Sequence, residues 1–479
     1  MGGNNRLNLT RRAFTRLLMG GTLGAGLVGC FRSDPGAVGN RQLFRAPKTT
    51  SMRMNDVTLT TLQNGLQLVH RPSNASAIVG ISLAIPMGAA NDEGSKAGRT
   101  NLLMRLLTKG TKTRSAEQIA TELADLGITL VTKPGYDTSY VAMKCLEQDV
   151  EKGFEILADV LTNPVFPVRE LDLEREKVLA GIRMSNDTPA GQASRELQAR
   201  LFPGHPYGVP LEGVPETLAQ ITATDLGNAH RDNFVPSNMV LASVGRLSAD
   251  TVRQLAEKHL GAVTVERRPR YVVDKTIAPG GTTTFFEKDS QQGYVLIGAL
   301  TCAQGDKDEA PLTVAATILG GGMSSRLFAE LRDRQGLAYA VGAGTSFLRT
   351  KGLFTVYIGT SPETIERWFP REPATDVNPA LRNDLWLQVD LLRREPVTQE
   401  ELARARNAIA GDLLRGRERN LTQSTQLAWQ QLTGVGPDYE DRFLEAIRSV
   451  TERDIMRVAN RYFLDPTVVV VRPRAQRTN

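Results

Sequence analysis

The side chains that could hold a catalytic metal ion are few in this sequence. It contains four histidines, and no two of them have the spacing of three or four residues that places side chains on one helical face. They are His70, His205, His230 and His259. A catalytic zinc ion needs three protein ligands and an open position for water. The sequence therefore predicts no metal site in this chain.

A different chemistry, the stabilisation of negative charge on a substrate oxygen, needs only hydrogen-bond donors. The segment LRDRQGLAYAVGA carries Arg332 and Tyr339, which present a guanidinium and a phenol. Both groups can donate to a substrate carbonyl and to the oxyanion that forms from it. An Arg on a helix face and a Tyr in a strand more often have structural roles, so the two residues alone do not distinguish a structural role from a catalytic one.

The segment 98–111 has the frame of a zinc-peptidase helix without its ligands. It reads GRTNLLMRLLTKGT and resembles the inverzincin motif, roughly G-x-x-H-F-L-E-H-M-L-F-K-G-T. The third ligand of such peptidases is a glutamate seven residues after another glutamate, and here Glu174 holds the place of the first. The positions of the two histidines, the base and the third ligand are occupied by Asn101, Arg105, Met104 and Gly181, respectively. The resemblance implies a zinc site that has lost all three ligands.

Arg105 admits two interpretations. It brings a permanent cation to a place built for Zn²⁺, where it could pair with a carboxylate and partly replace the lost charge. The alternative, which we favour from the sequence, is that drift has left a neutral, packed helix.

Further segments resemble the pitrilysin/insulinase family, and most of all its processing-peptidase-like branch. The similarity runs in a consistent order from about residue 56 to 472 and is carried by 203–226, 233–250, 319–341 and 396–414. The resemblance implies that two halves face each other across a cavity. It implies that Arg332 and Tyr339 complete the active site of a zinc-bearing sister chain. Gly320, Gly321 and Gly322 predict a flexible hinge or a close backbone approach, and in some relatives such a glycine-rich loop touches the peptide substrate.

The N-terminal residues resemble a targeting signal. Residues 10–30, TRRAFTRLLMGGTLGAGLVGC, combine paired arginines, a short apolar run and Cys30 after Leu-Val-Gly. The run is too short and glycine-rich for a spanning helix, and the pattern resembles a twin-arginine signal ending in a lipobox. We expect an export leader over 1–29, lipid attachment at Cys30 and a tether over 30–55. A plain secretory leader with an incidental cysteine is the alternative.

Alternating apolar runs separated by turn residues occur twice along the chain in the same order. Asn64-Gly65 predicts a hairpin at the start of the first half. The pattern predicts an α+β fold of two similar halves, each a mainly antiparallel sheet packed with helices. We place the N-terminal domain at 56–262, a linker at 263–283 and the C-terminal domain at 284–472.

The amino-acid composition limits the possible binding partners and the state of the cysteines. The formal charge of +6 includes four leader arginines, so the exported chain carries +2 (6 minus 4), which gives no reason to expect nucleic-acid binding. Two further cysteines, Cys145 and Cys302, lie in apolar strand-like runs in different halves. We expect buried thiols rather than a disulfide.

Taken together, these features predict a zinc-less subunit of a two-chain peptidase. It would be a bacterial lipoprotein on the outer (periplasmic or lumenal) face of a membrane, would bind a zinc-bearing homologous sister as a heterodimer, and would hold no cofactor itself. It would not cleave peptides alone. The alternative is a scaffold or peptide-holding protein of the same fold, and a self-sufficient metallopeptidase would need ligands that the sequence lacks.

Overall fold

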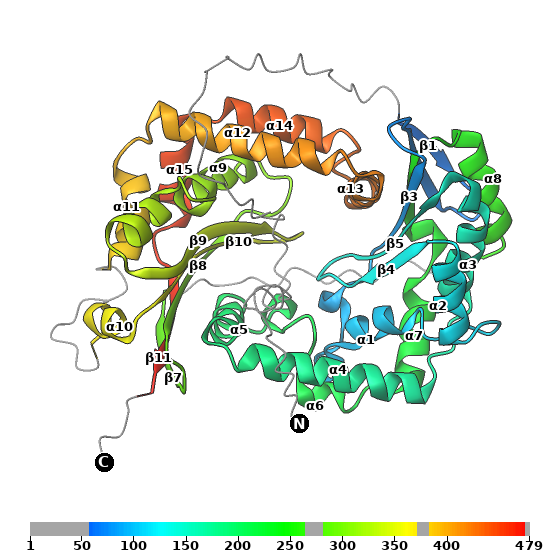
Figure 1. Ribbon diagram of the computed structural model, residues 1–479, viewed down its shortest axis with the longest axis horizontal. Coiled ribbons are helices and arrows are strands. Elements are labelled where there is room, and N and C mark those ends of the chain that lie inside the picture. The colour runs from blue at the N-terminus through cyan, green and yellow to red at the C-terminus, as the bar shows by residue number, and fades with distance from the viewer. Residues whose placement is uncertain (1–56, 264–280, 371–382, 475–479) are drawn as a thin grey trace, which may run out of the picture.

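A computed structural model of the chain describes residues 57–263, 281–370 and 383–474. Two sheets with their helices lie side by side (Figure 1). The predicted leader, Cys30 and the tether, as well as most of the predicted linker, lie outside the described residues.

The first sheet has six strands in the order β1-β2-β6-β3-β5-β4. All neighbours pair antiparallel except β2 and β6. The strands are β1 (Thr58–Thr61), β2 (Gln67–Pro72), β3 (Ile78–Ile85), β4 (Thr129–Lys133), β5 (Ser139–Leu146) and β6 (Val240–Gly245). The predicted hairpin is confirmed, because β1 and β2 are joined by a turn in which Gly65 takes a positive φ of 85°.

Among the described residues, eight helices lie in the same half of the chain as the first sheet. They are α1 (Arg99–Leu106), α2 (Ala116–Asp125), α3 (Val150–Thr162), α4 (Val168–Asn186), α5 (Pro189–Leu201), α6 (Pro215–Leu218), α7 (Ala223–Asn233) and α8 (Ala249–Leu260). Short 3-10 turns connect them: η2 (Ala89–Asn91), η3 (Gly94–Lys96), η4 (Glu147–Asp149), η5 (Pro206–Gly208) and η6 (Pro236–Asn238).

The second sheet has five strands in the order β7-β11-β8-β10-β9, with only β7 and β11 parallel. Its strands are β7 (Thr283–Lys288), β8 (Gly293–Thr301), β9 (Ala338–Phe347), β10 (Gly352–Thr360) and β11 (Thr467–Pro473). Its helices are α9 (Glu309–Gly320), the π-helix η7 (Phe328–Arg334), α10 (Pro362–Trp368), α11 (Asp384–Arg394), α12 (Gln399–Gly416), α13 (Asn420–Thr433), α14 (Tyr439–Ser449) and α15 (Glu452–Tyr462). The predicted α+β arrangement of two similar, mainly antiparallel halves is confirmed.

The two halves exchange one helix each. Helix α13, from the second half, packs on β3 and β6 of the first sheet, and α5, from the first half, packs on β8 and β11 of the second (Figure 1). The central strands of both sheets are therefore covered on both faces. In β3 every residue after the first is buried, with Leu83 in the core under the helices of its own half and Ala84 against α13. Two-sided burial is why these strands read as continuous apolar runs.

Helix α12 begins at Gln399 after a Thr398 cap, because the Thr398 hydroxyl accepts from the backbone N–H of Glu401. The segment that contains Arg332 forms the π-helix η7. The two cysteines are confirmed as buried free thiols. Among the described residues, no helix has the length and apolar character needed to cross a bilayer.

Candidate functional site

Helix α1 carries the segment that resembles a zinc-peptidase helix. Its N-terminus is held by Asp92, whose carboxylate accepts from the backbone N–H of Gly98 at 3.1 Å and from the Thr100 hydroxyl at 2.7 Å. Gly98 has a positive φ of 91°, and a Cβ there would lie 2.5 Å from the Glu212 carbonyl oxygen. Burial raises the pKa of Asp92 to about 6 although these donors favour the charged form. The position of the helix is thus fixed at its start.

The turn after α1 is fixed as well. Asp159 on α3 accepts from the hydroxyls of Thr111 at 2.6 Å and Thr113 at 2.9 Å. Arg114 donates to the same carboxylate at 2.9 Å. Helix α1 therefore keeps the rigid mounting that a catalytic helix needs.

On α1, Arg105 forms the centre of a polar cluster. Its Nε donates to Asn101 Oδ1 at 2.9 Å, one helical turn away, and its Nη1 lies 3.4 Å from Oε2 of Glu174 on α4. The interpretation favoured from the sequence, a neutral packed helix, is wrong at this position, because a buried carboxylate lies within reach of the long side chain. It holds for Met104, which is fully buried in the first core.

Two lysines complete the cluster around Glu174. Lys177 Nζ lies 2.7 Å and Lys109 Nζ 3.7 Å from Glu174 Oε1. Burial by itself would raise the pKa of Glu174, but the neighbouring ammonium and guanidinium groups hold the pKa below its ordinary value. Glu174 is therefore ionised at neutral pH.

The residues at this place do not fit a zinc ion. The one carboxylate, Glu174, is already shared by three cations, and Zn²⁺ would be repelled by all of them. Gly181 offers no ligand, and a Cβ at this exposed position would meet no heavy atom within 4 Å. Nowhere in 57–263, 281–370 and 383–474 do three His, Cys, Asp or Glu side chains gather in a way that could hold a metal ion.

Three of the four histidines form hydrogen bonds within the fold. His70 and His230 each bond a backbone carbonyl through Nε2, at 2.9 Å from Leu247 and 2.8 Å from Leu161. His205 Nδ1 accepts from the backbone N–H of Tyr207 at 3.1 Å. Burial lowers the pKa of both His70 and His230, which keeps them neutral.

Arg332 and Tyr339 lie in the second half and are both exposed, Tyr339 by 59%. Arg332 lies on η7 with its guanidinium 4.8 Å from the Phe328 ring centroid, and Tyr339 is the second residue of β9. The ring contact preorders the Arg332 side chain. A π-helix turn is rare and occurs often at functional positions. The structure does not bring these two residues into contact with the α1 cluster.

The glycines 320–322 end α9. A Cβ on Gly320 would lie 2.0 Å from the backbone nitrogen of Ala343 on β9, so this glycine permits a close approach of helix and strand. Gly322 has a positive φ of 151° with open space beyond it, and the next residue, Met323, is 77% exposed. The turn is anchored by Arg326, which bonds both oxygens of Glu401 at 2.6 and 2.9 Å. A substrate contact of this loop stays a prediction.

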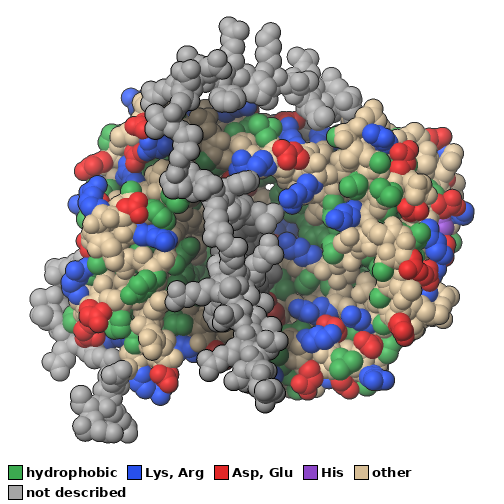
Figure 2. Space-filling view, in the orientation of Figure 1, with side chains coloured by type: hydrophobic (Ala, Val, Ile, Leu, Met, Phe, Trp, Pro, Cys, Tyr) green, Lys and Arg blue, Asp and Glu red, His purple; other side chains and the backbone are tan. Residues whose placement is uncertain are grey.

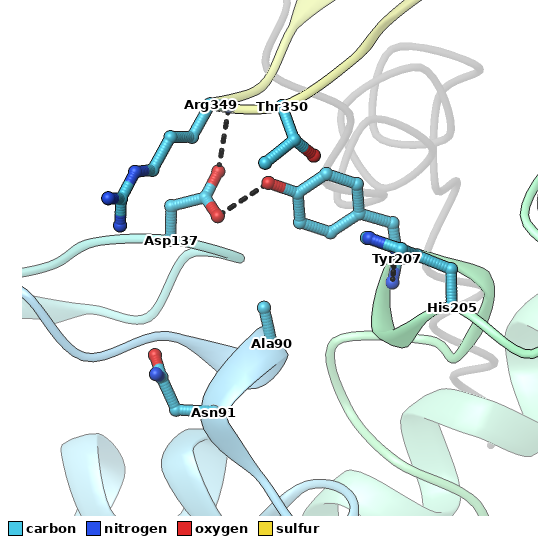
Figure 3. A pocket seen from close by; sticks show the side chains of 7 residues that line it. All are labelled: Ala90, Asn91, Asp137, His205, Tyr207, Arg349 and Thr350. Atoms are coloured by element: carbon cyan, nitrogen blue, oxygen red, sulfur yellow. Dashed lines mark hydrogen bonds between the residues drawn. The ribbon is translucent and has the colours of Figure 1, made fainter. Parts of the chain in front are cut away.

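A pocket at the joint between the halves also gathers polar side chains (Figure 3). Asp137 accepts from the Tyr207 hydroxyl at 2.6 Å and from the backbone N–H of Arg349 at 3.1 Å. Arg349 belongs to the β9–β10 turn of the second half. Because one oxygen of Asp137 is bonded within the first half and the other accepts from Arg349 of the second, we interpret this pocket as a structural joint.

Sequence reasoning missed Lys109 and Lys177 as members of the cluster. Lys177 is three residues after Glu174 on one helix, a spacing that predicts their contact. Lys109 and Glu174 are far apart in sequence, and only the packing of α1 on α4 brings them together.

Known proteins resemble this chain along most of its length. Residues 68–214 match the family described as insulinase (peptidase family M16), and residues 220–409 match the Peptidase M16 inactive domain. An uncharacterized zinc protease of Mycobacterium leprae is 32% identical over 69% of this chain and 74% of its own length. One of Streptomyces coelicolor is 30% identical over 84% and 86%. The chain belongs to peptidase family M16. The predicted family membership is confirmed.

Solved structures share the fold of this M16 protein. A protease from Helicobacter pylori has a TM-score of 0.78 at 22% identity, covering 87% of this chain and 99% of that one. A peptidase M16 inactive domain from Pseudomonas fluorescens has a TM-score of 0.78 at 23% identity, covering 88% and 98%. At such identities the likeness is one of fold.

Proposed function

We propose that this chain is the non-catalytic subunit of a two-chain M16 peptidase. A zinc-bearing sister chain supplies the metal and the catalytic base, and this chain supplies part of the substrate cavity and two hydrogen-bond donors, Arg332 and Tyr339. The observation that carries the proposal is the Arg105–Glu174 contact, since Arg105 stands at the position of a zinc-binding histidine and pairs there with a carboxylate instead of holding a metal ion.

The exposed donors support the second part of the proposal. The α1 site has lost its ligands, whereas Arg332 and Tyr339 remain exposed. A guanidinium and a phenol can both hydrogen-bond the oxyanion of a tetrahedral intermediate. Neither residue is needed for packing: Arg332 contacts Phe328 on the surface, and Tyr339 is largely exposed.

The proposal is tested in the complex with the sister chain. Arg332→Ala or Tyr339→Phe should leave assembly intact and lower kcat of the pair by about 10² to 10³, the usual effect of losing one oxyanion donor. KM should change little, because such donors act mainly on the transition state. Peptide cleavage and size-exclusion chromatography measure the two properties.

Metal analysis provides the control. The purified complex should contain zinc that chelators remove together with activity, and this chain alone should contain none in stoichiometric amount. Full activity of a complex carrying both substitutions would contradict the proposal and favour a scaffold or peptide-holding role.

We further propose that the chain is an exported lipoprotein anchored to the outer face of a membrane through Cys30. Support comes from the sequence of residues 10–30 alone. Wild-type protein should partition into detergent, because several acyl chains anchor stably, and Cys30→Ser should remain unprocessed or become soluble. A mature chain whose mass shows an unmodified Cys30 would contradict the anchor.

A further inference from the structure

We propose that the surface formed by Arg105, Lys109 and Lys177 binds a carboxylate group of a peptide. Three positive side chains contact the single negative Glu174, which leaves the cluster with a net charge of +2 (3 minus 1). The site belongs to this chain alone, so the inference does not depend on a sister subunit or on Arg332 and Tyr339.

The cations are not saturated by Glu174. A charge-assisted N–H···O contact is about 2.7–2.9 Å long. Only Lys177 reaches Glu174 at such a distance, whereas Arg105 stays at 3.4 Å and Lys109 at 3.7 Å. Among the described residues, neither Arg105 nor Lys109 has another acidic partner. Their side chains are 42% and 32% exposed, respectively, so both can donate outward to a second anion.

The site also has room for a ligand. Gly181 lies seven residues, or two helical turns, after Glu174 and therefore on the same face of α4. A Cβ at this exposed glycine would meet nothing within 4 Å. Space thus lies open next to the cluster. Figure 2 shows Lys and Arg side chains on the wall that the N-terminal half presents to the hollow between the halves.

A carboxylate is the anion that these groups already bind in Glu174. The planar guanidinium of Arg105 also suits a planar acceptor. Such a carboxylate can come from the C-terminus of a peptide or from an acidic side chain, and peptides of equal length separate the two sources. One peptide has a free C-terminus and no acidic residue, one is amidated and contains a glutamate, and one is amidated and neutral.

Calorimetric titration of the full chain should show tighter binding of one or both acidic peptides than of the neutral one, weakening as salt is raised. Lys109→Gln should weaken that binding about tenfold, as expected for one lost charged hydrogen bond. The matched control is Lys112→Gln, three residues away, which makes the same charge change at an exposed lysine without contact to Glu174. Equal binding of all three peptides, or an equal effect of both substitutions, would overturn the proposal.

A second pair of variants leaves every cation in place. Gly181→Glu puts a carboxylate beside the cluster and should compete with the peptide, lowering its affinity about tenfold. Gly181→Gln has nearly the same size without the charge and serves as the steric control. If both variants bind the acidic peptide equally, the cluster does not recognise a carboxylate. Inorganic phosphate and acetate are then compared as competitors of the peptide. If phosphate displaces the peptide at a lower concentration than acetate, the cluster is a general anion site and the preference for a carboxylate is overturned.

Discussion

At the scale of single residues, the contact between Arg105 and Glu174 replaces metal chemistry with an ion pair. The Glu174 side chain is only 5% exposed, so its charge needs compensation, while Arg105 is half-exposed and loses less hydration. Arg105→Met should lower the free energy of unfolding by about 1–2 kcal/mol at neutral pH, less than for a fully buried pair because two lysines remain. Urea denaturation measures this change.

The same pair predicts a pH dependence with a definite sign. Because the pKa of Glu174 is lower in the folded chain than its ordinary 4.5, the carboxylate stabilises the fold above that pH. The contribution is lost as the pH falls below about 4.5. The stability difference between wild type and Glu174→Gln should therefore shrink on acidification. In the Glu174→Gln background, Arg105→Met should have little effect. An undiminished effect there would mean that Arg105 acts by packing rather than by charge.

The sequence predicted the loss of zinc ligands and offered a carboxylate partner for Arg105 as one of two interpretations, but it did not identify that partner. Asn101, Met104, Arg105 and Gly181 are read directly from the aligned motif. The partner of Arg105 could not be identified from the sequence, because Glu174 lies 69 residues away along the chain and only the packing of α1 on α4 brings the two together. The spacing of Glu174 and Lys177 predicts one contact, but the contacts of Glu174 with Arg105 and Lys109 are tertiary features that local sequence periodicity does not show.

At the scale of elements, the exchanged helices depend on two glycines in the strands below them. A Cβ on Gly80 of β3 would lie 2.5 Å from the backbone of Asn420 on α13. A Cβ on Gly298 of β8 would lie 2.7 Å from the end of the Leu197 side chain on α5. A backbone cannot yield as a leucine tip can, so the two substitutions should differ.

Gly80→Ala should lower stability by about 1–3 kcal/mol, the usual cost of overpacking, and Gly298→Ala by less. Gly344→Ala is the matched control, because that strand glycine has nothing within 4 Å of its would-be Cβ. Thermal and urea unfolding measure all three variants. Equal destabilisation by Gly80→Ala and Gly344→Ala would show that the effect lies in the strand and not in the contact with α13.

The strands and helices were predicted from the pattern of apolar residues, but the exchange of α5 and α13 between the halves was not. The apolar run of β3 predicted a buried strand without saying what covers its second face. Helix α13 covers it partly with polar residues: Asn420 donates to the Ile78 carbonyl at 2.6 Å, and Ser424 bonds Ser82 at 2.9 Å. Buried polar residues whose partners lie more than 300 positions away leave no apolar period to recognise.

At the scale of the whole molecule, the exchange makes each half a part of the other's core. Helix α13 covers an apolar face of the first sheet that includes Ala84 and Val244. Helix α5 covers the corresponding face of the second sheet through Leu197 and Leu201. A fragment ending at residue 262 would expose the first of these faces and the apolar side of helix α5, and large exposed apolar patches promote aggregation.

Cutting the chain therefore should not separate the halves. A protease site introduced between residues 264 and 280 allows cleavage after folding, and the two fragments should then elute together on size-exclusion chromatography. The contacts that hold them are the two exchanged helices and the hydrogen bond from the Arg349 backbone to Asp137. The N-terminal half expressed alone should be insoluble or aggregated, because its first sheet lacks α13. Fragments that separate after cleavage, each soluble and folded by circular dichroism, would mean that the halves are independent domains and that the exchange contributes little to stability.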